Sequence, residues 1–318
     1  MTKINLDRSE GAAVNNMKSC FKICSILAVV ATVWRSVAFI TSFDSDVGYF
    51  NGSFLPTVAN WLLVLSVAIA LSGFYFINKN AVLPKTLDAS PNSVYFASIF
   101  AGFVLAADFI YKIYVMIGDE RFEYYAYIFK KGFRSDNSYL LRATAIIEIV
   151  GALSALLAAV WFFLRSSKKT KNGVVAALGF FPVLRALSGI AVVYFDMTVQ
   201  MNHPSKLLLQ IALIAIMFYF LCEIRFFVSE KHPRPRRYFV SGCVTILLGI
   251  VCGVSEMVGF FVGRTSKGAF CVEAFFCLTV GIYTVARVAS FVKSAESVDE
   301  PIAEQATDEV AELTEISE

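Results

Sequence analysis

Residues 206–228 read KLLLQIALIAIMFYFLCEIRFFV, and this stretch shows what kind of chain this is. Between Lys206 and Glu223 it holds no charged residue. A helix rises about 1.5 Å per residue, so about 20 apolar residues cross the roughly 30 Å hydrocarbon core of a bilayer. The stretch therefore predicts a membrane-spanning helix.

Similar stretches recur along the whole chain. Composition agrees with a membrane protein, because 57% of the 318 residues are hydrophobic and only 17% are charged, against about 25% charged in soluble domains. The sequence predicts an all-α integral membrane protein with about eight transmembrane helices. The predicted spans are 22–42, 57–77, 94–116, 141–164, 174–196, 206–228, 239–262 and 269–292.

The distribution of basic residues predicts the orientation of these helices. Of the 28 Lys and Arg residues, 17 lie in or beside the first segment, the last segment and the connections that follow even-numbered spans, against 8 in or beside the other connections. Cytoplasmic loops of membrane proteins carry such an excess. The chain is therefore predicted to be N-in/C-in, with a cytoplasmic segment 1–21, a transmembrane domain 22–292 and a cytoplasmic tail 293–318.

The tail is strongly acidic and has no basic residue after Lys293. A charge run of this kind favours a disordered, solvated segment. The alternative is a short amphipathic helix that docks a protein partner, because Asp299-Glu300-Pro301 resembles a helix start and apolar residues follow at helical spacing. Disorder is the preferred interpretation.

The ionisable residues within the predicted spans give the most information about a candidate binding site. A charge at the bilayer centre costs at least about 2.5 kcal/mol, so these side chains should face the bundle interior or a cavity. Counted from the inner helix ends, six of them fall in the outer half and Lys112 and Asp196 lie at its outer rim; the six are Arg35, Asp108, Glu148, Arg185, Glu256 and Glu273. The inner half is predicted to be nearly pure hydrocarbon. The candidate ligand-binding residues are Arg35, Asp108, Lys112, Glu148, Arg185, Glu256 and Glu273.

Pairing among these charges can be predicted in part. Asp108 and Lys112 lie one helical turn apart and can pair directly. The two arginines need carboxylate partners, for which the three glutamates are candidates. The alternative to a binding role is a structural one, in which ion pairs fix the helix register and the shallow side chains snorkel to the outer interface. The shallow side chains are Lys112, Asp196, Glu256 and Glu273. Pro182, close to Arg185, predicts a kink of the type found at binding sites in transporters, although packing alone also explains such kinks.

The polar positions raise the hypothesis of an internal repeat. The helices pair as four hairpins, each with an ionisable residue in the second half of its rising helix and a polar residue early in its returning helix. Repeated units are a common way to build transport folds. Sequence identity between the hairpins is negligible, so the four-hairpin repeat rests on this pattern alone.

Known catalytic and metal motifs are missing from the sequence. There is no Walker loop, His-Glu-x-x-His or Gly-x-Ser-x-Gly motif, so no catalytic residue is assigned. Seven cysteines lie mostly within apolar segments, where packing is the usual role. Cys20 and Cys24 are one turn apart, but two thiols alone make a poor metal site. Neither a metal nor a cofactor is predicted, and nucleic acid is not an expected partner.

One motif carries a resemblance. The run from Asp196 to Lys206 (DMTVQMNHPSK), continued by Gln210 and by Glu223-Ile-Arg225, resembles uncharacterised multi-pass membrane proteins of Gram-positive bacteria. The resemblance covers the fifth and sixth helices. It implies a multi-pass location in a bacterial cytoplasmic membrane and no known activity.

Three functions remain open from the sequence. The first is binding or transport of a small polar solute through an outward-facing polar cavity, with the lipid bilayer as surroundings. The second is a non-transporting sensor or assembly factor that acts through the acidic tail on a protein partner. An enzyme acting on lipids with Asp108 or Glu148 as acid or base comes last, because no nucleophile or metal set accompanies them.

Overall fold

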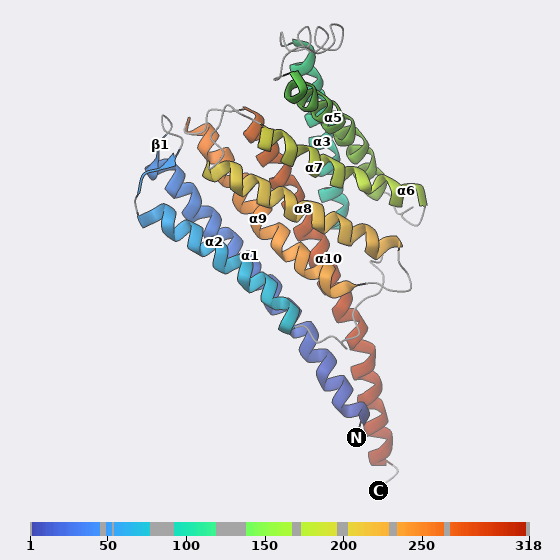
Figure 1. Cartoon of the computed structure of the whole chain (residues 1–318). Coiled ribbons are helices and arrows are strands. Elements are labelled where there is room, and N and C mark those ends of the chain that lie inside the picture. The colour runs from blue at the N-terminus through green and yellow to red at the C-terminus, as the bar shows by residue number, and fades with distance from the viewer. Residues whose placement is uncertain are drawn as a thin grey trace.

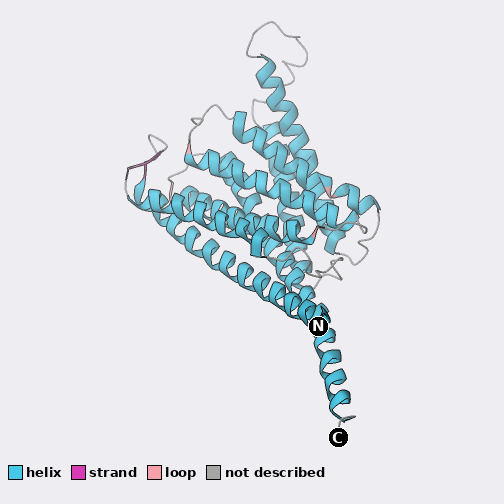
Figure 2. Ribbon diagram, turned by 60° about the horizontal axis from the view of Figure 1, so that its bottom comes forward, coloured by secondary structure: helices cyan, strands magenta, loops and turns pink. Residues whose placement is uncertain are grey.

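The computed structural model describes residues 2–44, 49–52, 54–76, 92–118, 138–166, 173–195, 203–228, 234–263 and 268–315. Nearly all of these residues are helical (Figure 2). The elements in chain order are α1 (Thr2–Ser42), β1 (Phe43–Asp44), β2 (Tyr49–Phe50), α2 (Phe54–Phe76), α3 (Asn92–Gly118), α5 (Ser138–Ser166), α6 (Gly173–Leu178), α7 (Phe180–Phe195), α8 (Pro204–Val228), α9 (Pro235–Phe261) and α10 (Gly268–Glu315).

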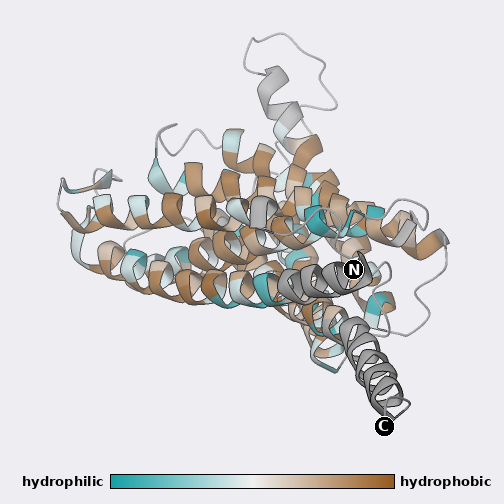
Figure 3. Ribbon diagram, turned by 90° about the horizontal axis from the view of Figure 1, so that it is seen from below, coloured by the Kyte–Doolittle hydropathy of each residue, from teal (hydrophilic) through white to brown (hydrophobic). Residues whose placement is uncertain are grey.

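The predicted fold class is confirmed. Eight helical stretches of the described chain are long and apolar enough to cross a membrane, with α6 and α7 together forming one of them. Apolar residues dominate their ribbons (Figure 3). The spans are Asn15–Ser42, Phe54–Gly73, Asn92–Ile117, Thr144–Ser166, Val174–Phe195, Pro204–Phe226, Pro235–Phe261 and Phe270–Ala295.

Consecutive helices pack as pairs. The pairs are α1 with α2, α3 with α5, α7 with α8, and α9 with α10, and neighbouring pairs also contact each other through α5 with α7 and α8 with α9. The two helices of the last pair lie at the centre, since α9 also contacts α1, α2 and α8, while α10 contacts α1, α3 and α8. Both termini lie at the same end of the bundle (Figure 1), as an even number of spans requires. The charge pattern predicts that this end faces the cytoplasm, and "inner" below means the end of the bundle that carries the termini and "outer" the opposite end.

Glycines allow the central pair of helices to approach closely. A Cβ at Gly249 of α9 would lie 2.8 Å from the carbonyl oxygen of Cys277 on α10. A Cβ at Gly253, one turn later, would lie 2.5 Å from Cβ of Leu278. Small residues spaced four apart bring helix backbones together in membranes, where packing rather than water exclusion drives association. The contact holds α10, which carries Glu273, against α9.

The fifth span is interrupted between α6 and α7. Gly179 forms a turn whose N–H points to both the carbonyl of Val175 at 3.2 Å and that of Ala176 at 3.1 Å. Pro182 follows three residues later, and its ring crowds the carbonyl four residues before it while offering no N–H. The interruption that Pro182 predicts is therefore present, and Arg185 lies one turn beyond it.

The outer connection after α1 contains an element that the sequence did not predict. Strands β1 and β2 form an antiparallel pair in which Phe43 faces Phe50 and Asp44 faces Tyr49. The N–H of Asn51 continues the pairing by donating to the carbonyl of Ser42 at 2.7 Å. The aromatic ring of Phe39 lies 5.1 Å from that of Phe43 and 5.0 Å from that of Phe50. This small hairpin covers the outer end of α1.

The first and last helices extend beyond the predicted transmembrane domain 22–292. Helix α1 begins at Thr2 and passes through position 21, and α10 continues unbroken through position 293 to Glu315. A helix thus stands where the charge run favoured a disordered tail. The sequence of the tail explains this difference, because Glu and Ala are strong helix formers and its apolar residues recur at helical spacing.

Candidate functional site

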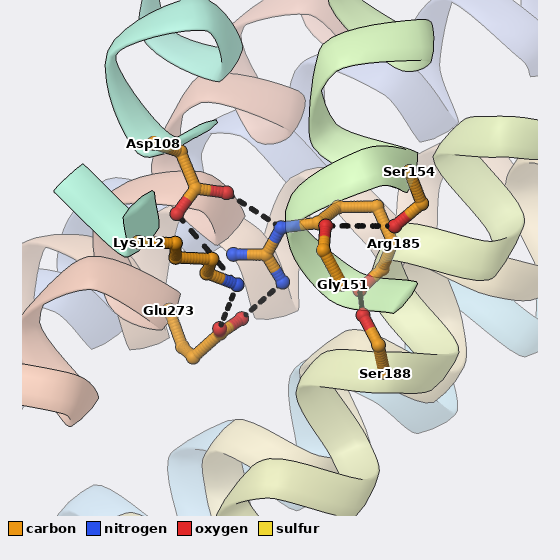
Figure 4. A network of polar contacts seen from close by, with 7 residues as sticks. All are labelled: Asp108, Lys112, Gly151, Ser154, Arg185, Ser188 and Glu273. Carbon is orange, nitrogen blue, oxygen red and sulfur yellow. Dashed lines mark hydrogen bonds and ion pairs between the residues drawn. The ribbon is translucent and has the colours of Figure 1, made fainter. Parts of the chain in front are cut away.

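The centre of the candidate site is a group of four charged side chains from three helices, here called the ionic ring (Figure 4). Asp108 and Lys112 come from α3, Arg185 from α7 and Glu273 from α10. Arg185 Nε donates to Asp108 Oδ2 at 2.6 Å, and its Nη1 donates to Glu273 Oε2 at 2.8 Å. Lys112 Nζ lies 3.4 Å from Glu273 Oε1 and 3.7 Å from Asp108 Oδ1. Each cation therefore contacts both anions.

The ionic ring is almost completely enclosed. The exposed fraction of the side chain is 0% for Arg185, 3% for Glu273, 5% for Asp108 and 15% for Lys112. An unpaired ion in such surroundings costs several kcal/mol, so two cations and two anions are tolerated together because they neutralise one another. The guanidinium of Arg185 also lies 4.7 Å from the ring centre of Phe276, where the aromatic face adds a favourable interaction.

Two atoms of the ionic ring lack a hydrogen bond. Among the described residues, Arg185 Nη2 and Asp108 Oδ1 have no hydrogen-bond partner although both atoms are buried. The contact of Asp108 Oδ1 with Lys112, at 3.7 Å, is electrostatic and too long for a hydrogen bond. A buried polar atom without a partner is unusual in a native structure and marks a place where a ligand group can bind.

Glycine and serine residues of α5 and α7 close one side of the ionic ring. A Cβ at Gly189 would lie 2.5 Å from Glu273 Oε2 and 3.1 Å from Arg185 Nη1. A Cβ at Gly151 would lie 3.0 Å from Ser188 Oγ, which donates to the carbonyl of Arg185 at 2.9 Å. This side is packed without room for an added methyl group.

Substitution of Gly189 by alanine should therefore destabilise the protein. Overpacking of this kind costs about 1–3 kcal/mol because the ion pairs must move to accommodate the methyl group. The free energy of unfolding can be measured by titration with dodecyl sulfate in mixed micelles. Gly52→Ala is the matched control, because a Cβ there meets no atom within 4 Å, and it should change stability by less than about 0.5 kcal/mol. Equal effects of the two substitutions would contradict the packing described for Gly189.

A cavity adjoins the ionic ring at Asp108. It has a volume of about 300 Å³ and lies between α3, α9 and α10. Asp108 is the one charged residue of its lining, and the others are mostly apolar: Val104, Leu105, Ala107, Tyr111, Met257, Cys271, Val272, Phe275 and Phe276. Ala107 and Tyr111 are exposed and lie within the span of α3, so the cavity opens toward lipid rather than water. It is thus not the polar cavity that the sequence predicts.

A second polar cluster lies near the outer ends of α1, α2 and α9. Arg35 Nη1 donates to Asn60 Oδ1 at 3.2 Å, and the guanidinium lies 5.5 Å and 5.7 Å from the ring centres of Phe39 and Phe50. Glu256 of α9 interacts electrostatically with Arg35 and is 1% exposed. The small β-hairpin thus helps to bury Arg35. Because Glu256 is buried, it does not snorkel.

His203 lies next to this cluster, just before α8. Its Nδ1 accepts the N–H of Ser205 at 3.2 Å, and its ring packs near those of Phe43 and Phe270. Burial, with the nearby cations Arg35 and Lys206, lowers the pKa of His203 from its ordinary 6.5 to about 4. The folded protein therefore holds this imidazole neutral at pH values where the unfolded chain takes up a proton.

The stability of the protein should consequently depend on pH through His203. Above about pH 7 the imidazole is neutral in both states and contributes no pH dependence. As the pH falls from 6.5 toward 4, the unfolded state binds the proton first, so the melting temperature should fall. His203→Gln removes the titrating group, and its melting temperature should fall less over the same range. Parallel curves for the two proteins between pH 7 and pH 5 would contradict the low pKa.

A third polar cluster, here called the inner cluster, occupies the inner half of the bundle, and the sequence analysis did not predict it. Glu223 Oε1 of α8 accepts hydrogen bonds from Tyr283 Oη at 2.8 Å and Arg287 Nε at 3.1 Å, both on α10. Arg165 Nη2 of α5 lies 3.9 Å from the same oxygen. All three charged residues are at most 3% exposed. The prediction of a nearly pure hydrocarbon inner half is therefore wrong, and a charged Glu223 within the stretch 206–228 was the available signal.

The predicted site residues thus fall into separate groups. Asp108, Lys112, Arg185 and Glu273 form the ionic ring, so the prediction that Arg185 pairs with a glutamate is confirmed, as is the pairing of Asp108 with Lys112. The snorkelling alternative is wrong for Glu273, which is 2% exposed. The other predicted residues lie elsewhere: Arg35 and Glu256 in the second cluster, and Glu148 at a half-buried position of α5. Positions 196–202 of the sequence motif lie outside the described residues.

The fold and these buried charges define the class: a polytopic helical membrane protein with three enclosed polar clusters. Comparison of the chain with protein-family models, curated proteins and solved structures gives no match. The function is therefore argued from the site itself.

Proposed function

We propose that this membrane protein binds a small amphipathic cation that enters from the lipid bilayer, and that it moves such molecules across a bacterial cytoplasmic membrane. The apolar part of the ligand would fill the cavity between α3, α9 and α10. Its cationic group would bind Asp108. The proposal keeps the small-solute function that the sequence favours, with an apolar cavity in place of a polar one.

The single observation that carries the proposal is the position of Asp108. Its carboxylate belongs to the ionic ring and also forms part of the cavity lining. Oδ2 is held by Arg185 at 2.6 Å, while Oδ1 has no hydrogen bond among the described residues. An ammonium group in the cavity would supply the missing hydrogen bond and compete with Lys112 for Oδ1. Most ligand pockets combine an apolar lining with a few polar groups in this way.

The volume and surroundings of the cavity favour a small ligand. A cavity of about 300 Å³ lies at the lower end of the range for drug-sized molecules. Within the low-dielectric membrane a carboxylate attracts a cation more strongly than it does in water. An anion in the cavity gains no such interaction, because the one charged residue of the lining is Asp108, which would repel it.

A matched pair of probes tests the proposal. 4-Phenylbutylammonium should raise the melting temperature of the detergent-solubilised protein, whereas the neutral 4-phenylbutanol should raise it little. Val272→Trp occupies the cavity from a residue that is not part of the ionic ring, and it should abolish the difference. Asp108→Asn keeps the shape of the side chain, and it should also abolish the difference between the two probes. Equal stabilisation by both probes, or full stabilisation of Val272→Trp, would refute cation binding at this place.

A sensor role is the second candidate, and the continuity of α10 favours it. One helix connects Glu273 of the ionic ring to the acidic segment that ends at Glu315, so a ligand that shifts Glu273 has a direct mechanical link to the tail. Uptake measured in proteoliposomes separates the two candidates. Probe accumulation that survives truncation after residue 295 supports transport, whereas ligand binding without accumulation supports a sensor.

A further inference from the structure

Three cysteine thiols meet near the inner end of the bundle. Cys20 and Cys24 come from α1, and Cys243 comes from α9. Their sulfur atoms all lie within 4.8 Å of one another. Cys24 and Cys243 are fully buried, and Cys20 is half-buried. We call these three residues the thiol cluster.

Helix packing explains why the thiols converge. Cys20 and Cys24 are one turn apart and so share a face of α1, the helix that packs along α9. The third helix of the site is α2, where a Cβ at Gly73 would lie 3.3 Å from Sγ of Cys20. Met17 is completely buried and lies on the same face of α1, one turn before Cys20. The cluster is therefore enclosed by three helices and surrounded by sulfur and apolar groups.

Packing alone is the ordinary role of a buried cysteine, which behaves as a small hydrophobic residue. The thiol cluster differs because three of the seven cysteines gather at one point, although Cys243 is far from the other two in the sequence. Among the described residues, it is the one group of three His, Cys, Asp or Glu side chains close enough to hold one ion. The meeting of three sulfur donor atoms at one point is therefore better explained by a ligand than by packing alone.

The geometry points to a site for a soft metal ion, Cu(I), held by the sulfur atoms of the thiol cluster. A metal–thiolate bond is about 2.3 Å long, so three sulfurs around one ion lie about 4 Å apart, close to the arrangement seen. Thiolate and thioether ligands select Cu(I) over hard cations. Structural zinc sites require four protein ligands, and the group contains three. Binding exchanges ligands without electron transfer, as each thiol that becomes a thiolate releases its proton to solvent.

The thiol cluster lies near the end of the bundle where its cysteines are expected to stay reduced and able to bind copper. Cys20 lies in the span Asn15–Ser42, two residues before the apolar run that begins at position 22, so it is close to one end of the membrane-spanning part of α1. This is the end of the bundle where both termini lie, and the charge pattern predicts that it faces the cytoplasm. Thiols there remain reduced and able to bind metal. The site lies on α1 and α9, apart from the ionic ring on α3, α7 and α10, so it is independent of the cation-binding proposal.

The test is an anaerobic titration of the reduced, full-length protein with Cu(I), in competition with the chromophoric chelator bathocuproine disulfonate. The wild-type protein should remove one Cu(I) per chain from the chelator. Cys24→Ser and Cys243→Ser should each lose this binding. Cys222→Ser is the matched control, because this half-buried cysteine of α8 lies outside the thiol cluster, and it should keep full binding.

A second measurement does not depend on the variants being folded. X-ray absorption of the copper-loaded wild-type protein should show sulfur neighbours alone, at about 2.3 Å. Oxygen or nitrogen neighbours, failure of the wild type to compete with the chelator, or undiminished binding by folded Cys243→Ser would each overturn the assignment. A Cys24–Cys243 disulfide in freshly isolated membranes with blocked thiols would also overturn it, in favour of redox chemistry.

Discussion

Replacement of Arg185 by methionine should destabilise the protein by about 3–5 kcal/mol, the cost of breaking a buried ion pair from one side. Methionine retains much of the apolar volume of arginine, so the loss is mainly one of charge. Asp108 and Glu273, which Arg185 binds at 2.6 Å and 2.8 Å, would share Lys112 as their remaining cation in the ionic ring. The free energy of unfolding in mixed micelles measures the effect.

A second substitution separates lost charge balance from lost packing. Arg185→Met combined with Asp108→Asn leaves Lys112 facing Glu273, a balanced pair already 3.4 Å apart. The double variant should therefore be more stable than Arg185→Met alone, although each substitution removes native contacts. Coupling between contacting residues is commonly 0.5–3 kcal/mol, about the size of the recovery expected. A double variant with the summed loss of the two single ones would show that charge balance does not hold the ionic ring together.

The transmembrane architecture could be predicted because it depends on local sequence. An apolar run such as 207–222 must be helical in lipid, where every backbone polar group needs a partner within its own segment. The pairing of Asp108 with Lys112 is equally local, since one helical turn separates them. The interruption near Pro182 also follows from covalent structure. None of these features requires knowledge of which helices are neighbours.

The remaining features depend on contacts between distant segments. Residue spacing predicts Glu273 near the outer interface, yet the packing of α10 against α3 and α7 brings it to Arg185 on α7. Cys243 meets Cys20 because α9 packs on α1, which hydropathy does not show. The apolar nature of the cavity was likewise hidden, because polar residues are conspicuous in a membrane sequence and the apolar walls between them are not.

The inner cluster around Glu223 provides the second prediction. Replacement of Glu223 by leucine should destabilise the protein by about 3–5 kcal/mol, because Arg165 and Arg287 lose the carboxylate that both contact and then repel each other. Tyr283 would lose its acceptor at 2.8 Å as well. Glu223→Gln keeps an acceptor oxygen but no charge, so its loss should be smaller than that of Glu223→Leu.

Tyr219→Phe is the control for this substitution. Tyr219 lies one turn before Glu223 on α8, and its hydroxyl shares a 3.3 Å hydrogen bond with the hydroxyl of Tyr238. Loss of one neutral hydrogen bond costs about 1 kcal/mol, so this variant should remain much closer to the wild type. Adding Arg287→Met to Glu223→Leu removes one of the two facing cations and should recover part of the stability. If Glu223→Leu is no less stable than Tyr219→Phe, the inner cluster does not hold α5, α8 and α10 together, and its charges serve some other purpose than packing these helices.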